Sequence, residues 1–373
     1  MKSYPATLRV ATFNASMEAD NYCRGAEARD PRALERRLRS GRNRQICNIA
    51  EIIQRVRPDI LLLNEFDYIK DPRRGALAFQ RRYLAVSQNG QRPIHYRHVY
   101  TAPVNSGEPS PLDIDGDGLA SGSGGDAWGF GHYPGQYGML VLSRFPIERS
   151  RVRSFRLFPW HKMPGAREPM HPDGSPFYDE LTWRQLRLSS KSHWDLPIQI
   201  RGQTLHLLAA HPTPPVFDGP ERRNAARNFD EIRLWADYVD PSRSGYLMDD
   251  LGVAGGLAPE AAFVIVGDYN ASPVEGRSLP GAIEQLLGHP LVNSELEPNS
   301  QGGAQHSQAN PHGQSHTADW RARVDYVLPS RSGIEVEQGG VFWPEPSSDQ
   351  AYLVSGRGAS SDHRLVWLDL RLD

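Results

Sequence analysis

Cysteine is scarce in this sequence, which contains only Cys23 and Cys47 among its 373 residues. Two cysteines are too few for a disulfide framework, and their spacing matches no zinc site, although one bridge between them stays open. No run of about 18 apolar residues occurs, so we expect no transmembrane segment. An expected strand begins by about Leu8 and leaves no room for a signal peptide. We therefore expect a cytoplasmic protein, or a secreted or periplasmic one whose signal was removed.

An excess of charge of either sign is missing as well. The 42 Lys and Arg residues nearly balance the 44 Asp and Glu residues, and the formal net charge is −2. A protein that gathers nucleic acid through its overall charge has a strongly basic face. The balance therefore disfavours tight binding of duplex DNA, and any polyanion needs a local basic patch.

Short apolar segments of the kind that form β-strands recur along the chain. A content of 39% hydrophobic residues with 34 Gly and 30 Pro is typical of a folded, loop-rich protein. The expected strands are Leu8–Phe13, Ile60–Leu63, Met139–Leu142, Gln185–Leu188, Thr204–Ala209, Phe263–Val266, Val324–Leu328 and Leu365–Leu370. Two long helices are expected at about Pro31–Val56 and Pro220–Val239, the second with Asp218 as its N-cap.

The order of these elements indicates the fold class. Strands outnumber helices and occur in consecutive groups, which favours two packed sheets over one doubly wound parallel sheet. We therefore predict an α/β protein of the α+β type, a four-layer sandwich of two mixed β-sheets flanked by helices. Residues 1–373 would form a single domain, with loop insertions at about 101–135 and 297–318.

Polar residues stand at the ends of the expected strands with unusual regularity. They are Asn14, Glu65, His211, Asp268 with Asn270, Asp325, and Asp362 with His363. In layered α/β folds, functional sites gather at strand ends. A single Asn or Asp after a strand is most often part of a turn, but this whole series indicates a common site.

Three motifs in this series carry a resemblance to a known family. Gly-Asp-Tyr-Asn at 267–270 and Ser-Asp-His at 361–363 are the most specific, and Arg-Val-Asp-Tyr-Val-Leu at 323–328 lies between them. With these motifs, the sequence resembles the endonuclease/exonuclease/phosphatase superfamily over about residues 8–370. The resemblance implies a deoxyribonuclease-like, metal-dependent phosphoesterase.

The resemblance implies a divalent metal ion held by Asn14, Glu65 and Asp362. Mg²⁺ or Mn²⁺ is expected, because Mg²⁺ prefers carboxylates, waters and substrate phosphate as ligands. Glu65 would be the principal ligand, and Asn14 would bind the metal or orient a bound water. Asn64 stands where the family often has Gln, a difference that we expect to matter little.

The resemblance also assigns catalytic roles. Asp268 would position or deprotonate the attacking water, and Asn270 would donate a hydrogen bond to the phosphate. His363 would contact the phosphate or assist proton transfer, held in one tautomer by Asp325. His211 resembles a second catalytic histidine, a general acid for the leaving oxygen. The sequence shows no clear carboxylate partner for His211.

An acidic segment in the first insertion matches the opening half of a calcium-binding loop. Asp113, Asp115 and Asp117 alternate so that three carboxylates point at one ion. The twelfth position of the loop is Gly124 in place of the bidentate Glu, and Asp126 is a candidate substitute. A Ca²⁺ site and a plain acidic turn both stay open.

The substrate is less well defined by the sequence. Gln136, Lys191 and His193 are candidate substrate-binding residues, since cationic and aromatic groups suit phosphates and bases. A turn between two strands explains Lys191 and His193 equally well.

The sequence thus predicts a divalent-metal-dependent hydrolase of phosphate esters, with a phosphodiesterase or nuclease preferred over a phosphomonoesterase. Its partner would be a phosphate-ester substrate, nucleic acid included, and no protein partner is inferable. One alternative is a secreted lipid phosphodiesterase of the sphingomyelinase type, which needs an exposed apolar surface such as Trp128 with Phe130 or Phe158 with Trp160. The other is a non-catalytic binding protein, which the complete set of motif residues disfavours.

Overall fold

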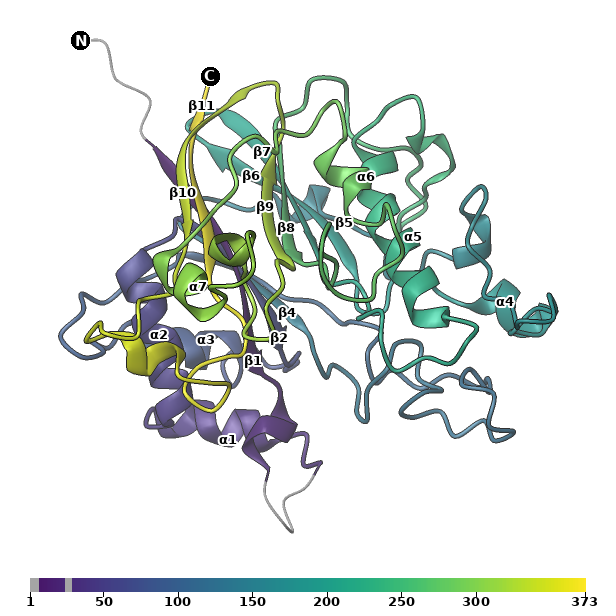
Figure 1. The fold of residues 1–373 in the computed structure, drawn as a ribbon, viewed down its shortest axis with the longest axis horizontal. Coiled ribbons are helices and arrows are strands. Elements are labelled where there is room, and N and C mark those ends of the chain that lie inside the picture. The colour runs from purple at the N-terminus through teal and green to yellow at the C-terminus, as the bar shows by residue number, and fades with distance from the viewer. Residues whose placement is uncertain (1–6, 24–28) are drawn as a thin grey trace.

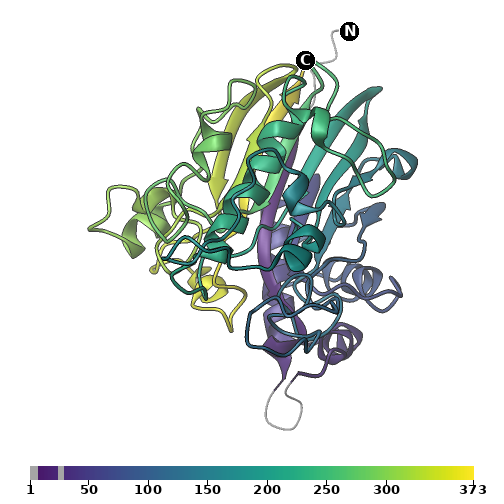
Figure 2. The same cartoon turned by 90° about the vertical axis from the view of Figure 1, so that its right-hand side faces the viewer.

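Two mixed β-sheets lie face to face in the computed structural model, which describes residues 7–23 and 29–373 (Figures 1 and 2). The six-stranded sheet has the order β10 (Ile334–Val341), β11 (Val366–Leu372), β1 (Leu8–Met17), β2 (Ile60–Phe66), β4 (Met139–Ser143) and β3 (His98–Tyr100). The five-stranded sheet has the order β5 (Arg153–Ser154), β6 (His193–Ile200), β7 (Gln203–Ala210), β8 (Phe263–Asp268) and β9 (Asp325–Pro329).

Helices cover the outer faces of both sheets. On the six-stranded sheet lie α1 (Ala33–Ser40), α2 (Arg44–Val56) and α3 (Ala76–Phe79), and on the five-stranded sheet lie α5 (Arg223–Tyr238) and α6 (Glu284–Leu287) (Figure 1). The short helices α4 (Glu180–Gln185) and α7 (Gln301–His306) belong to connecting segments. The predicted four-layer α/β sandwich is confirmed. Within the described residues, no helix combines the length and the apolar character that crossing a bilayer requires.

Alternation along the strands builds the three apolar layers of this sandwich. In β1, Val10 packs in the core between the sheets, whereas Ala11 and Phe13 pack against the helices on the outer face. In β8, Val266 faces the inter-sheet core and Ile265 faces the layer of α5 and α6. Successive side chains of a strand point to opposite faces, so strands buried on both faces are apolar throughout.

The helix predicted at 31–56 is interrupted near its middle. α1 ends at Ser40 with Gly41 as its C-cap, whose φ of 64° is left-handed, and α2 begins at Arg44 behind the N-cap Asn43. Glycine adopts this conformation without the steric cost that a side chain imposes. α5 begins at Arg223, so the N-cap residue is Arg222 and not the predicted Asp218. Asp218 still accepts hydrogen bonds from the backbone N–H groups of Asn224 and Ala225 in the first turn.

The strand predicted at 185–188 is wrong. Gln185 is the last residue of α4, and the three residues after it form only an isolated bridge between Arg187 and Pro159, although Leu186 and Leu188 are buried. Two strands of eight residues, β6 and β10, were not predicted. Pro197 lies inside β6 and argues against a central strand. It is tolerated because β5 pairs only with Trp194 and Asp195, which leaves the rest of that edge of β6 free of a ladder.

The two segments predicted as insertions differ from each other. Residues 101–135 form neither helix nor strand and are held by isolated bridges, as a long loop is expected to be. Residues 297–318 contain α7 and a short 3₁₀ turn at Gly313–Ser315. The second segment is therefore a small structured extension. The single domain stays a prediction.

Candidate active site

The strand ends that the sequence singled out meet at one end of the sandwich. β1 and β2 run parallel and present Asn14 and Glu65 there, and β7 and β8 run parallel and present His211 and Asp268. β9 is antiparallel to β8, so its first residue, Asp325, pairs directly with Asp268. His363 precedes β11, which is antiparallel to β1. The two sheets therefore bring residues from distant parts of the chain together.

Asp268 lies at the centre of this site. Its Oδ2 atom accepts a hydrogen bond of 3.0 Å from Asn14 Nδ2, and it lies 3.4 Å from His211 Nε2 and 3.5 Å from His363 Nε2. Burial alone would raise the pKa of this carboxyl group, but the charge of His363 and the hydrogen bond from His211 hold the pKa well below its usual range. Asp268 is therefore an ionised carboxylate in a buried setting.

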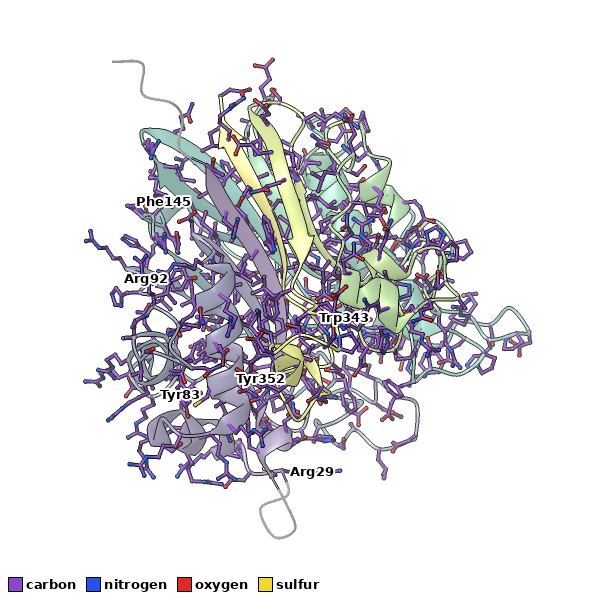
Figure 3. The ribbon with its side chains drawn as sticks, turned by 60° about the vertical axis from the view of Figure 1, so that its left-hand side comes forward. Arg29, Tyr83, Arg92, Phe145, Trp343 and Tyr352 are labelled. Carbon is purple, nitrogen blue, oxygen red and sulfur yellow. The ribbon has the colours of Figure 1, made fainter. Side chains whose placement is uncertain are left out.

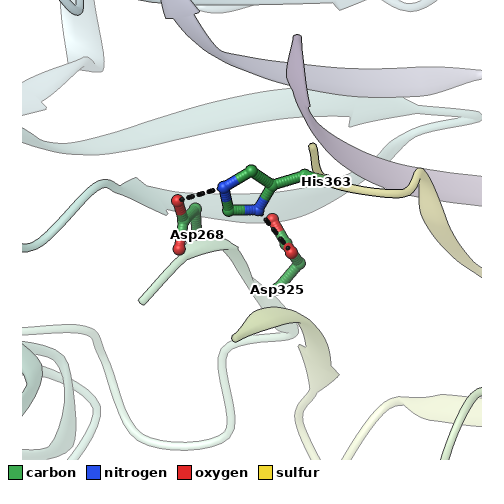
Figure 4. Close-up of side chains that lie close together, drawn as sticks. All are labelled: Asp268, Asp325 and His363. Atoms are coloured by element: carbon green, nitrogen blue, oxygen red, sulfur yellow. Dashed lines mark hydrogen bonds and ion pairs between the residues drawn. The ribbon is translucent and has the colours of Figure 1, made fainter. Parts of the chain in front are cut away.

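His363 is fixed between two carboxylates (Figure 4). Its Nδ1 atom lies 2.9 Å from Asp325 Oδ2, and the Thr317 hydroxyl donates a hydrogen bond of 2.7 Å to the same oxygen. Burial would lower the pKa of His363, but the charges of Asp325 and Asp268 outweigh it and raise the pKa to about 10. The ring is thus held in a charged state and a defined orientation.

Glu65 and Asp362 face a common cation position. Arg357 lies 3.7 Å from Glu65 Oε2 and 3.5 Å from Asp362 Oδ2, so one guanidinium group reaches both carboxylates. The Glu65 Oε2 atom is buried and has no hydrogen-bond partner, and Ser16 donates a hydrogen bond to the other Asp362 oxygen. A buried carboxylate oxygen left without a donor is costly. These residues fit a divalent cation with oxygen ligands.

The amides of Asn14 and Asn64 connect the two sheets behind this position. Asn14 donates to Asp268, and its own Oδ1 accepts from the Ser16 backbone N–H. Asn64 on β2 accepts from the Asp268 backbone N–H and donates to the Ala210 carbonyl, 3.2 and 3.3 Å away. The shorter amide at position 64 therefore reaches across the sandwich and positions Asp268.

Two site residues have backbones in the left-handed region. Glu65 has a φ of 55° and Asn270 a φ of 51°. Such conformations cost free energy in residues other than glycine and persist where the surroundings enforce them, most often at functional sites. Asn270 is held by hydrogen bonds from its backbone N–H to Asp268 and from its side chain to the Pro212 carbonyl.

The three predicted substrate contacts have different surroundings. Lys191 is buried, and the charges of Glu231, Glu65 and Asp268 act on it, which places its ammonium group within electrostatic reach of the site. The structure does not bring His193 there. Its ring is fully enclosed, with Nδ1 bonded to Ser189 and Nε2 to the Glu231 carbonyl.

Gln136 is likewise fully buried. Its Nε2 atom donates to Asp20, and its Oε1 accepts from the His132 backbone N–H. Both ends of the amide are therefore engaged in holding the 132–137 segment, and no part of it faces solvent.

The acidic loop brings four carboxylates together. Ligand atoms of Asp113, Asp115, Asp117 and Asp126 all lie within 4.8 Å of one another, so Asp126 stands where the sequence suggested a substitute. Asp113 accepts from the N–H groups of Gly116 and Gly118, as in an acidic turn. Calcium binding at this loop stays a prediction.

Three residues of the site were missed by sequence reasoning. Arg357 precedes the Ser-Asp-His motif by four residues, and a basic residue in a Gly-Arg-Gly loop gives no signal of its own. Trp320 is 49% exposed, and its ring lies edge-on to His363 at 4.8 Å. Arg364 is buried and donates to the carbonyls of Ser361 and His363, which fixes the motif. Only the adjacency of Arg364 to that motif could have pointed to it.

Fold and site together are those of a two-sheet α/β protein with a carboxylate and histidine centre at its strand ends. A model of the endonuclease/exonuclease/phosphatase family matches residues 11–363, and the chain belongs to this family. Its members are hydrolytic enzymes that act on phosphate esters.

A solved structure of this family supports the fold, and two weaker matches are given beside it. An endonuclease/exonuclease/phosphatase from Beutenbergia cavernae DSM 12333 is 18% identical with a TM-score of 0.53, covering 98% of this chain and 72% of that one. The catalytic domain of human nocturnin with bound sulfate is 17% identical, with a TM-score of 0.46 and coverages of 98% and 95%. A mutant beta toxin from Staphylococcus aureus with bound magnesium ions is 10% identical, with a TM-score of 0.47 and coverages of 98% and 99%. No curated protein gives a significant sequence match.

Proposed function

We propose that the protein is a divalent-metal-dependent phosphodiesterase that acts on nucleotide-type esters. The observation that carries this proposal is the position of Asp268. Its carboxylate is in contact with Asn14, His211 and His363, next to the cation position of Glu65 and Asp362. Hydrolysis of a phosphoester needs an oriented water, groups that compensate negative charge and a stabilised leaving oxygen, and this site offers all three.

Glu65 and Asp362 would hold a Mg²⁺ or Mn²⁺ ion, with Asn14 beside them. When bound, such an ion supplies Lewis-acid polarisation of the phosphoryl oxygens and a template for the substrate.

The remaining steps belong to the chain's own side chains. The ionised Asp268 carboxylate accepts a hydrogen bond from the attacking water and orients it toward phosphorus. The charged His363 ring compensates the negative charge that builds on the phosphoryl oxygens. Burial lowers the pKa of His211, so its neutral ring has a single N–H, which faces Asp268 in the free protein. In the proposed reaction this N–H donates to the leaving oxygen in place of Asp268, and the leaving oxygen takes up the proton that the attacking water gives up. Asn270 and Lys191 are the additional phosphate donors of this proposal.

The exposed ring of Trp320 favours a substrate with a planar group. It lies in contact with His363, at the edge of the proposed phosphate position. Base stacking on an aromatic side chain contributes roughly 1–3 kcal/mol per base. This observation supports a nucleotide ester over a small aliphatic phosphomonoester.

The sphingomyelinase-type alternative receives less support. It requires exposed apolar side chains, and of the four aromatic residues considered, Trp128, Phe158 and Trp160 are buried in the core beside α5. Phe130 alone is exposed, at 55%. The two candidate pairs from the sequence therefore supply one exposed ring between them, which is less than the apolar surface that this alternative expected of them.

Two variants test the proposal on bis-p-nitrophenyl phosphate and p-nitrophenyl phosphate with added Mg²⁺ or Mn²⁺. We expect the diester to be the better substrate, and Asp268→Asn and His211→Gln to lower kcat by about 100-fold or more. Asp173→Asn is the matched control, because that exposed carboxylate bonds only within its own turn. Asp268→Asn with wild-type kcat would refute the assignment.

A further inference from the structure

A second anion-binding position adjoins the proposed catalytic centre. A cavity of about 360 Å³ lies between the segment after β1, the start of α2 and the loop before the Ser-Asp-His motif. Asn21, Asn43, Arg44, Gln45 and Arg357 contribute to its walls. Its size is at the lower end of small-molecule sites. Because Arg357 also contacts Glu65 and Asp362, the cavity continues directly from the cation position.

Among the described residues of the cavity walls, Arg44 supplies the positive charge that no carboxylate balances, since Arg357 also lies within ion-pair distance of Glu65 and Asp362. Two guanidinium groups and three side-chain amides line the cavity, and none of its lining residues is acidic. Arg44 is exposed, and among the described residues no carboxylate pairs with it. A guanidinium group presents a planar fork of N–H donors that matches a phosphate. The start of a 13-residue helix adds a smaller positive contribution.

The walls of the cavity are fixed in place. Gln45 donates to the carbonyls of Ala15 and Ser360, and thus connects α2 to β1 and to the loop that carries Arg357. The same loop is anchored on α2 from its other end, where the Tyr352 hydroxyl on η8 (Ala351–Val354) donates to Glu51 (Figure 3). The amide N–H groups of Gln45 are therefore engaged within the protein, and the guanidinium groups of Arg44 and Arg357 are the donors that the cavity offers to a ligand. A cavity whose walls are held in place loses little entropy on binding.

We propose that this cavity binds a second phosphate of the substrate, next to the phosphodiester that is cleaved, and that the substrate is a single-stranded oligonucleotide. The inference rests on the proposed phosphodiesterase function and adds its substrate class. A positively charged cavity beside the reacting phosphate suits a chain with a phosphate at every residue, whereas a choline lipid would bring a cationic headgroup to two arginines. Trp320, whose exposed ring contacts His363, suits a base of the same chain.

The test compares two substrates and two arginine variants. A thymidine trinucleotide carries a phosphate beside the scissile one, and bis-p-nitrophenyl phosphate does not. We expect Arg44→Ala to lower the ratio of kcat/KM for the trinucleotide over that for the diester about tenfold, the loss of one charge-assisted contact. For the trinucleotide, the slope of log kcat/KM against log salt concentration should be less steep in Arg44→Ala than in the wild type, by about 0.7.

Arg42→Ala is the matched control, since Arg42 is also exposed, lies two residues away and is not part of the cavity wall. The Arg42→Ala variant should keep the wild-type ratio of kcat/KM for the trinucleotide over that for the diester. Arg44→Lys should keep most of that ratio, because it preserves the positive charge. Equal ratios in Arg44→Ala and Arg42→Ala, in an enzyme that cleaves the diester, would overturn the subsite and leave the phosphodiesterase intact. Sphingomyelin vesicles cleaved faster than the trinucleotide would also overturn it. A wild-type protein that cleaves neither test substrate overturns both proposals.

Discussion

The hydrogen bond between Asp325 and His363 holds the histidine ring of the proposed site in one orientation. Asp325→Asn removes the charge that holds the His363 ring while preserving the shape of the side chain. Because a carboxylate fixes the tautomer and orientation of its histidine partner, we expect kcat to fall between about 10-fold and 100-fold, with a smaller change in KM. The measurement is steady-state hydrolysis of bis-p-nitrophenyl phosphate over a pH series.

Asp349→Asn is the control for that substitution, because Asp349 is exposed and accepts only from the neighbouring Ser348. The account is contradicted if Asp325→Asn keeps the wild-type kcat across the pH series.

The burial of His193 predicts how the free energy of unfolding depends on pH, and it makes no prediction about catalysis. Burial lowers the pKa of His193 to about 4, from an ordinary value of 6.5. The unfolded chain therefore binds a proton that the folded protein does not between these two pH values, and stability falls as pH falls from about 6.5 to about 4. The contribution is about 3 kcal/mol. Urea unfolding of wild type and His193→Asn at pH 7.5 and pH 5 measures it, and equal pH dependence in both proteins would exclude it.

Motif residues of the site were predictable, whereas their neighbours were not. Asp268 and His363 lie in short, specific motifs, so their types and order alone indicated a site. Arg357 and Trp320 lie in loops whose course depends on distant packing, and nothing local marks them. His193 was predicted to contact substrate and does not. It lies beside an expected turn and therefore looked accessible, but its ring is buried against Trp235 of α5.

Gly41 separates two helices where the sequence predicted one, and this single residue ends the first of them. Its φ of 64° is left-handed, and it separates α1 from α2. Gly41→Ala forces a side chain into that conformation, and we expect the free energy of unfolding to fall by about 1 kcal/mol. Gly245→Ala is the control, since an added Cβ atom there meets open space and its φ is not positive. Urea denaturation that shows equal stability for the two variants would argue against the left-handed boundary.

Strands with a clear apolar run were predictable, and those that depend on neighbours were not. Phe263–Val266 and Leu8–Phe13 are apolar on both faces because both faces are covered. β6 contains a proline that only its partly free edge tolerates. β10 contains charged residues at its exposed positions, and its glycines, Gly339 and Gly340, lie so close to Leu368 and Trp367 of β11 that a Cβ atom would be crowded there. Leu186 and Leu188 are apolar because they are buried in the core without joining a ladder.

At the scale of the whole molecule, a bound cation should stabilise the fold. A ligand that binds only the folded state raises the free energy of unfolding by RT ln(1 + [L]/Kd), which is about 2.7 kcal/mol at a ligand concentration of 100 times Kd. We therefore expect Mg²⁺ or Mn²⁺ to raise the Tm of chelator-treated protein by several degrees, and Glu65→Gln to lose that rise. Glu295→Gln, with a side chain 73% exposed, should keep it. A rise of the same size in Glu65→Gln would mean that the ion binds elsewhere.

The whole architecture was more predictable than its details, for a physical reason. The count and grouping of apolar segments decide between one sheet and two, and errors at single segments such as 185–188 do not change that decision. The pairing of the two sheets also explains why polar residues from six separate segments converge, since parallel neighbours such as β1 with β2 and β7 with β8 end on the same side.

The central claim is that Glu65 and Asp362 hold a cation that phosphodiester hydrolysis requires. The most direct measurement strips wild type and Glu65→Gln with chelator, adds back Mg²⁺, Mn²⁺ or Ca²⁺ separately, and follows bis-p-nitrophenyl phosphate hydrolysis. The account predicts that Mg²⁺ or Mn²⁺ restores activity to wild type and restores none, or less than about one hundredth, to Glu65→Gln. Full activity of wild type in excess chelator, or equal restoration of both proteins, would contradict it.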